Sequence, residues 1–156
     1  MISVDIICED DGWRTDEVLT ARLTEAICLA AKRSALPIPP DSEVSLVLGN
    51  DAMIRGLNAQ WRKRDKPTNV LSFAANDGLP PEDWSPLLGD IIIARETVER
   101  EADGQGKSFD DHLLHLAVHG MLHLLGLDHQ NDADGDAMEA LETRILAEMG
   151  IPDPYQ

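Results

Sequence analysis

Residues 113–129, LLHLAVHGMLHLLGLDH, combine a helix that is apolar on nearly every side with three histidines at the spacing HxxxHxxGxxH. A helix that is hydrophobic all round is buried at the centre of a domain, so this segment predicts the core of the fold. His119 and His123 lie one turn apart, about 40° from each other around the helix, so their imidazoles can converge on one ion. Gly126 then ends the helix, because glycine tolerates the left-handed conformation of a C-cap. We expect the turn to return His129 to the same ion.

Three neutral imidazoles with one open position are typical of a catalytic zinc site, whereas a structural site is normally closed by a fourth ligand, often a thiolate. We therefore predict one Zn²⁺ per chain, bound by His119, His123 and His129. Nickel (Ni²⁺), copper and iron also accept imidazole ligands, so Ni²⁺ or another divalent transition metal is the alternative to zinc. An isolated histidine on an apolar helix is more often a core residue. This four-residue pattern, however, arises by chance in only roughly one chain in several thousand.

The residue after the first histidine bears on the type of chemistry. Metalloproteases with this spacing carry a glutamate there, which acts as general base on the metal-bound water. This chain has Gly120 instead. The ligand spacing alone favours a metallopeptidase or another zinc hydrolase, and Gly120 counts against the peptidase. Asp128 is the nearest carboxylate in sequence, but we expect it to cap the turn, so that a metal-bound hydroxide needs no dedicated base.

The chain has 156 residues and a formal net charge of −16, and we expect one domain spanning residues 1–156. Residues 1–8 lack the basic and long apolar segments of a signal peptide, and no apolar run is long enough to span a membrane. We therefore expect a cytoplasmic protein. Cys8 and Cys28 lie outside any CxxC pattern and are expected to be small buried apolar residues rather than metal ligands.

Four cations fall within five residues of this acidic chain: Arg62, Lys63, Arg64 and Lys66. Exposed charges more than about 8–10 Å apart are largely screened at physiological salt, so one basic loop can hold a phosphate backbone on an acidic protein. A solvated run of charges is the alternative interpretation.

The rest of the sequence alternates strand and helix patterns. Thr15 is expected to cap the first helix, and Ile54, Leu57 and Trp61 to form the inner face of the second. Residues 76–86 are rich in Pro, Asp and Gly and predict a mobile loop. Strands are predicted at 2–8, 44–48, 69–74 and 90–94, and helices at 16–35, 51–61, 95–102 (ended by the glycines at 104 and 106), 109–125 and around 138–149.

Four motifs extend nearly the length of the chain: LNAQWRKRDKPTNVLSF at 57–73, LGDIIIA at 88–94, HLAVHGMLHLLGLDH at 115–129 and MEALE at 138–142. With these motifs in this order, the chain resembles the YbeY family, bacterial metal-dependent endoribonucleases that take part in ribosomal RNA maturation. The resemblance implies a single-domain α+β fold. In this fold a mixed sheet of about four strands packs with about five helices, and the metal site lies on a central buried helix and the turn after it.

The resemblance also implies a function. It predicts a zinc-dependent endoribonuclease specific for single strands that acts in maturation of the small-subunit rRNA 3′ end and in ribosome quality control. Zinc lowers the pKa of its bound water to about 7, and the resulting hydroxide would attack a phosphodiester in line. The resemblance makes Arg62 a functional arginine, and its guanidinium can grip phosphate oxygens with two parallel hydrogen bonds. Many members have Asp where this chain has Asn69, and Pro where it has Ala74, so an acid role at position 69 is in doubt.

Several roles stay open. A ribosome-associated binding factor with a mainly structural metal is the alternative to a hydrolase, and the ribosome or its proteins are possible partners in either case. His112 and His115 lie on the same helix face as His119. His115 can orient a metal-bound imidazole, although core packing or a helix-end hydrogen bond accounts for both residues equally well. Met138 either lies beneath the metal or is a core residue.

Overall fold

A four-stranded mixed sheet forms the frame of the molecule. Strands β1 (Ser3–Cys8), β2 (Glu43–Gly49) and β4 (Leu87–Ala94) run parallel to one another, and β3 (Val70–Ala74) pairs antiparallel with β4. The strand order β1-β2-β4-β3 places β3 at an edge. The computed structural model describes residues 2–128 and 131–156. The predicted mixed sheet is confirmed, although β4 begins at Leu87 rather than at residue 90.

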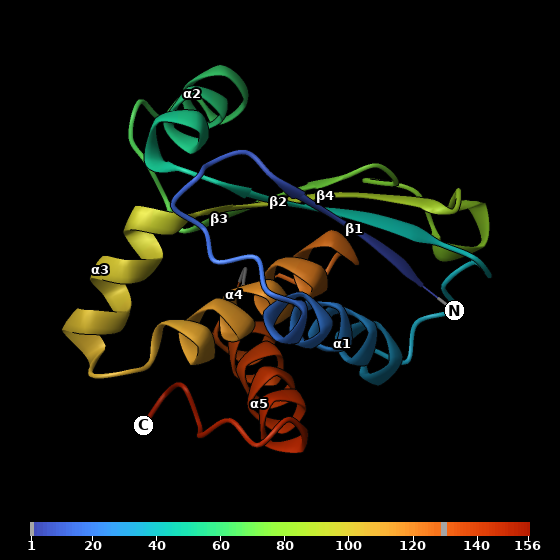
Figure 1. Cartoon of the computed structure of the whole chain (residues 1–156). Coiled ribbons are helices and arrows are strands. Elements are labelled where there is room, and N and C mark those ends of the chain that lie inside the picture. The colour runs from blue at the N-terminus through green and yellow to red at the C-terminus, as the bar shows by residue number, and fades with distance from the viewer. Residues whose placement is uncertain (1, 129–130) are drawn as a thin grey trace.

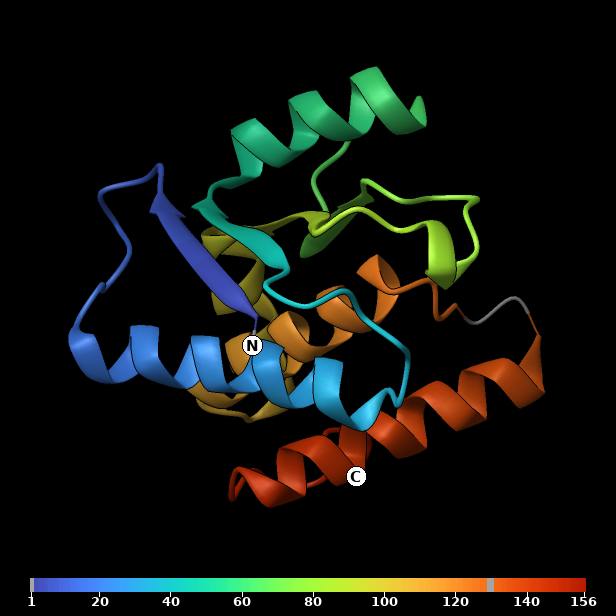
Figure 2. The same ribbon diagram turned by 90° about the vertical axis from the view of Figure 1, so that its right-hand side faces the viewer.

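Helices cover both faces of this sheet. Helix α2 lies on one face, while α1 and α4 lie on the other and α5 packs beneath them, as Figures 1 and 2 show from two directions. The loop at 76–86 contains a single 3₁₀ turn, Pro81–Asp83. No helix in the described part of the chain is long and apolar enough to cross a membrane. The five helices, which confirm the α+β class, are α1 (Glu17–Arg33), α2 (Asp51–Arg62), α3 (Arg95–Gln105), α4 (Phe109–Leu124) and α5 (Asp132–Glu148).

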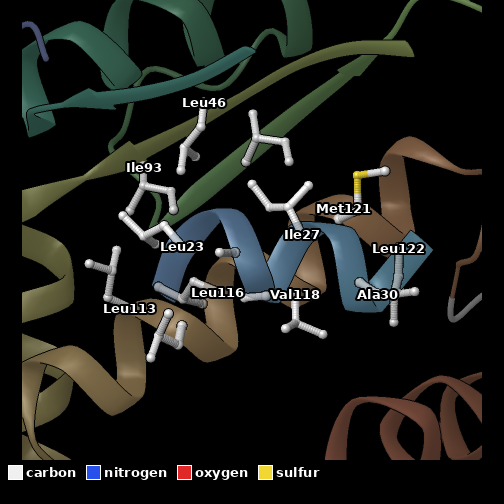
Figure 3. Close-up of a cluster of buried hydrophobic side chains, with 14 of the residues drawn as sticks. Leu23, Ile27, Ala30, Leu46, Ile93, Leu113, Leu116, Val118, Met121 and Leu122 are labelled. Carbon is white, nitrogen blue, oxygen red and sulfur yellow. The ribbon is translucent and has the colours of Figure 1, made fainter. Parts of the chain in front are cut away.

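Helix α4 occupies the centre of the main core, as its apolar sequence predicts. Most of its side chains are buried between the sheet, α1 and α5. Full burial of a Leu, Val or Met side chain contributes roughly 1.5–3 kcal/mol, so the core around α4 supplies much of the driving force for folding. Figure 3 shows part of the cluster: Leu23 and Ile27 from α1, Leu46 and Ile93 from the sheet, and Leu113, Val118 and Met121 from α4.

A smaller apolar cluster joins α2 to the opposite face of the sheet. Ile54 packs there against Leu71 and Ile92, and Leu57 lies at its margin. The helical spacing predicts Trp61 on this inner face as well, but its side chain is 64% exposed. The prediction is wrong because the apolar surface beyond Leu57 on this face is the Phe73 ring, and the guanidinium of Arg62 rather than Trp61 lies over it.

Helices α1, α2, α4 and α5 each begin after a residue whose side chain accepts a backbone N–H group. Asp16, rather than the expected Thr15, caps α1, and its Oδ1 accepts from the Leu19 amide at 2.8 Å. Ser108 caps α4, and its hydroxyl oxygen accepts from the Asp111 amide at 3.1 Å. Helix α3 continues through position 104 and ends at Gly106, whose φ of 67° is left-handed.

Asp10 ties the loop after β1 to the starts of two helices. Its carboxylate accepts hydrogen bonds from the Gly12 amide at 2.7 Å, from Asn50 Nδ2 at 3.0 Å and from Arg95 Nε at 3.1 Å. The hydrogen bond from Asn50, followed by those from Gly12 and Arg95, holds the pKa of Asp10 below its ordinary value of 3.8. Asn50 is the cap of α2 and Arg95 begins α3, so one carboxylate joins three segments.

Candidate active site

A groove of about 800 Å³ opens between the edge strand β3 and the C-terminal end of α4. Arg62, the last residue of α2, and Arg64 from the turn after it line the groove, and the whole of β3 lines it from the sheet. His119 and His123 reach it from α4, and Asp128 from the turn that follows. The structure thus brings Arg62 and two of the three predicted metal ligands to one surface.

His119 and His123 of α4 point their Nε2 atoms at each other, 2.9 Å apart. Two imidazole nitrogens that converge this closely form a donor set suited to a transition metal. The third predicted ligand, His129, lies outside the described residues. Within residues 2–128 and 131–156, no group of three His, Cys, Asp or Glu side chains is placed to hold a metal ion. The three-histidine site therefore stays a prediction, in which His119 and His123 supply two convergent donors.

A buried carboxylate lies behind the first histidine. Glu142 of α5 has no exposed surface, and its Oε1 accepts a hydrogen bond from His119 Nδ1 at 2.8 Å. Burial alone would raise the pKa of Glu142, but hydrogen bonds from His115 and His119 outweigh it and hold that pKa at about 2. A carboxylate that stays ionised can only accept, so Nδ1 of His119 carries a proton and Nε2 keeps the lone pair that a metal needs.

A second polar chain begins at the other end of the histidine row. His112 Nε2 lies 2.9 Å from Glu101 Oε1, and Asn69 Nδ2 donates to the same oxygen at 3.1 Å. Burial lowers the pKa of His112, although the neighbouring Glu101 opposes this shift. Asn69 is therefore a donor to a carboxylate rather than an acid. His112 is buried and does not line the groove that His119 and His123 reach.

Gly120 is explained by packing. A Cβ at this position would lie 2.8 Å from Ile91 Cγ2 and 3.2 Å from Val70 Cγ2, so the residue faces the sheet and not the groove. The Ser72 hydroxyl donates to the Gly120 carbonyl at 2.7 Å and fastens α4 to β3. A glutamate placed as in metalloproteases has no room here, which supports the expectation that position 120 supplies no base.

Arg62 is held by the edge strand. Its Nη2 donates to the Ser72 carbonyl at 3.0 Å, and its guanidinium lies over the Phe73 ring, 5.6 Å from the centroid. Within the described residues no other hydrogen bond engages this side chain, so its remaining N–H donors can contact a ligand in the groove.

The cations that follow Arg62 are exposed to solvent. Lys63 adopts a left-handed conformation that ends α2, and Arg64 and Lys66 continue the turn. Asp65 is the acidic residue within this run, and Arg55 binds it through Nε at 2.8 Å. The negative charge of Asp65 is therefore compensated, and the loop presents a positive surface at the end of the groove.

Comparison with known proteins identifies the relatives of this chain. The family described as Endoribonuclease YbeY has a model that matches residues 6–150. The chain belongs to the YbeY family. Endoribonuclease YbeY of Rhizobium etli is 52% identical and covers 99% of this chain and 94% of its own length. The YbeY protein of Agrobacterium fabrum is 48% identical, covering 99% of this chain and 95% of its own.

A solved structure agrees with the fold. The solution structure of TM1509 from Thermotoga maritima covers 95% of this YbeY chain and 92% of its own, with 26% sequence identity and a TM-score of 0.59. That agreement supports the strand and helix arrangement that frames the groove.

Sequence reasoning missed Glu142 and Tyr155. Glu142 follows Met138 by four residues and precedes Ile145 by three, so it interrupts the apolar stripe of α5, and all three side chains are buried. A single carboxylate inside an apolar stripe was the available signal, because a buried charge requires partners. Met138 is a core residue with 2% exposure. Tyr155 carried no signal, since its position depends on how the C-terminal residues return to the protein.

Proposed function

We propose that this YbeY chain is a zinc-dependent endoribonuclease that cuts single-stranded RNA during maturation of the small-subunit rRNA 3′ end, with a part in ribosome quality control. An endoribonuclease is a hydrolase whose substrate is RNA, and the relatives carry that name. The observation that carries the proposal is the groove in which Arg62 shares one surface with His119 and His123. A cytoplasmic protein with access to ribosomal precursors fits this role.

His119, His123 and His129 would hold the metal. When bound, zinc supplies an activated water at neutral pH and neutralises charge on a phosphate oxygen. The convergence of two Nε2 atoms at 2.9 Å and the carboxylate behind His119 support this assignment. Neutral imidazoles are the form that binds a metal, so acid conditions would weaken the site.

Arg62 would bind the scissile phosphate. Its guanidinium is permanently charged, and the Ser72 carbonyl together with the Phe73 ring fixes its position before substrate arrives. A donor that is already oriented stabilises developing negative charge without reorganisation at the moment of reaction. Asp77 and Asp128 also line the groove, and neither is required as a base in this proposal.

The surroundings of Arg62 favour a single strand. Trp61 exposes 64% of its side chain next to the cations at 62, 63, 64 and 66. Exposed aromatic rings stack on unpaired bases, while cations follow the phosphate backbone. A duplex hides its bases from such a ring. We therefore expect binding that weakens steeply with salt and prefers unpaired RNA.

Cleavage of a fluorescent single-stranded RNA by zinc-loaded protein tests the proposal. We expect Arg62→Glu and His119→Ala to lose at least about 100-fold in rate while staying folded, as judged by circular dichroism. Arg144→Glu is the matched control, because Arg144 is an exposed arginine of α5 outside the groove, and it should keep full activity. Equal cleavage by all four proteins would show that a contaminating nuclease acts and would refute the assignment.

The ribosomal role needs a cellular test. Cells that lack the protein should accumulate small-subunit rRNA with unprocessed 3′ ends, and a copy carrying Arg62→Glu should not correct the defect. Full correction by this folded but inactive variant would instead favour a binding factor with a structural metal.

A further inference from the structure

Three hydrogen-bond donors meet on one carboxylate at the core side of the groove. Glu142 Oε1 lies 2.8 Å from His119 Nδ1 and 3.2 Å from His115 Nε2, and Oε2 accepts from the Tyr155 hydroxyl at 2.8 Å. His119 lies on α4, Glu142 on α5 and Tyr155 in the C-terminal segment. These contacts link a predicted metal ligand to residues near the chain end.

The shared carboxylate imposes opposite proton positions on two neighbouring histidines. His119 donates through Nδ1, which leaves its Nε2 directed at His123 Nε2. His115 uses Nε2 for Glu142 and also approaches the Tyr155 oxygen at 3.2 Å, so that nitrogen is occupied. The Nδ1 atom of His115 is buried and has no partner among the described residues. Although both histidines lie on one face of α4, only His119 can offer Nε2 to the groove.

Tyr155 is held in place by the segment around it. Its backbone N–H donates to Asp153 Oδ1 at 2.8 Å, and Lys107 Nζ donates to the Pro154 carbonyl at 2.7 Å. Its ring meets that of His115 edge to face, with centroids 5.4 Å apart. The tyrosine thus satisfies Oε2 of Glu142, the oxygen that neither histidine contacts.

We propose that Glu142 and Tyr155 are positioning residues of the metal site: Glu142 fixes the orientation and tautomer of His119, and Tyr155 fixes Glu142. The inference rests on the proposed function only in taking His119 as a metal ligand. A carboxylate behind a metal-bound imidazole raises the basicity of the ring, and loss of such a partner typically weakens metal binding by about 10–100-fold. The C-terminal residues therefore contribute to the metal site without touching the metal.

Zinc affinity measured by competition with a chromophoric chelator provides the first test. In Glu142→Gln the single amide oxygen cannot receive all three donors, so we expect zinc binding about 10–100-fold weaker. Tyr155→Phe keeps the ring and removes only the hydroxyl, and we expect a smaller loss, about 3–10-fold. Asp136→Asn removes the same charge from an exposed position of α5 and should bind zinc like the wild type.

The tautomer of His119 in metal-free protein provides a readout that a merely structural role would not change. Nitrogen-15 NMR should show the proton on Nδ1 in the wild type and in Asp136→Asn, and a mixture with Nε2–H in Glu142→Gln. Unchanged zinc affinity and an unchanged tautomer in folded Glu142→Gln and Tyr155→Phe would overturn the proposal. If Glu142→Gln does not fold, the Tyr155→Phe result decides.

The failure of this inference can be separated from failure of the proposed function. Wild-type protein that binds zinc, responds to Glu142→Gln as expected and cleaves no RNA would refute the nuclease and leave the positioning role intact. Zinc-dependent RNA cleavage by the wild type, with unchanged zinc affinity in Glu142→Gln and Tyr155→Phe, would support the nuclease and refute the positioning role.

Discussion

Gly120 sets how closely helix α4 approaches the sheet, and Gly120→Ala measures this directly. The new methyl group would lie 2.8 Å from Ile91 Cγ2, 3.2 Å from Val70 Cγ2 and 3.3 Å from Ser72 Oγ. The first distance is shorter than a carbon contact allows, and Ile91 is fully buried in the core. The helix, the strand or the Ile91 side chain must therefore shift, and a shift of the helix or strand would also strain the hydrogen bond from Ser72 to the Gly120 carbonyl.

Two opposing effects determine the size of the change. Alanine in a helix interior is about 1 kcal/mol more favourable than glycine. Overpacking of a well-packed core costs about 1–3 kcal/mol. We therefore expect Gly120→Ala to lower the free energy of unfolding by about 0–2 kcal/mol. Gly120→Glu, which recreates the metalloprotease sequence, should lower the free energy of unfolding much further, because its carboxylate enters the interface between α4 and the sheet without a partner.

Urea denaturation monitored by circular dichroism measures both changes, and Gly56→Ala provides the control. Gly56 lies in α2, and a methyl group added to it would meet no atom within 4 Å beyond the adjacent backbone of its own helix, so alanine should stabilise the protein by about 1 kcal/mol. In an Ile91→Ala background, which removes the clashing carbon, Gly120→Ala should become stabilising. If alanine stabilised both glycine positions equally in the wild-type background, the close contact with β4 would be refuted.

Three further predictions concern zinc, pH and charge. Zinc at about 100 times its Kd should raise the melting temperature of metal-free protein by roughly 5–10 °C, and a His119→Ala variant that showed the same rise would contradict the ligand assignment. The pKa of Asp10 is lowered from 3.8 in the folded state, so its stabilisation is present above the unfolded pKa and is lost as pH falls through the folded value. The urea midpoints of wild type and Asp10→Asn should therefore differ at pH 7 and converge in acid. A difference between the midpoints that stays constant with pH would refute this role of Asp10. Asn69→Asp replaces a donor to Glu101 by a like charge and should cost about 1 kcal/mol at pH 7, measured by urea denaturation, with a smaller cost at pH 3.

Local patterns in the sequence were enough to place much of the fold. The apolar run from Leu113 to Leu125 correctly predicted the central helix, because a helix without a polar face has no other stable location. The four-residue spacing of His119 and His123 likewise predicted that their imidazoles converge, which depends only on helix geometry. Both inferences depend on residues close together in the chain.

The errors arise where distant segments meet. Trp61 has the correct helical phase for the inner face of α2, but the phase does not reveal where the apolar cluster beneath that helix ends. Thr15 and Asp16 are both good capping residues, and the choice depends on backbone conformation at the helix start. The contacts of Glu142 and Tyr155 join α5 and the chain end to α4, and no local spacing encodes them.

Ser72 contacts both sides of the groove, the side of Arg62 and the side of α4. Its carbonyl accepts from Arg62 and its hydroxyl donates to Gly120, the neighbour of His119 in α4. The guanidinium and the helix that carries the imidazoles are therefore both held by one residue of β3, a strand that is paired to β4. Because one residue holds both groups, we expect RNA to be selected by whether its backbone can bend to reach the guanidinium and the imidazoles together. Closure of the protein around the RNA would not be needed.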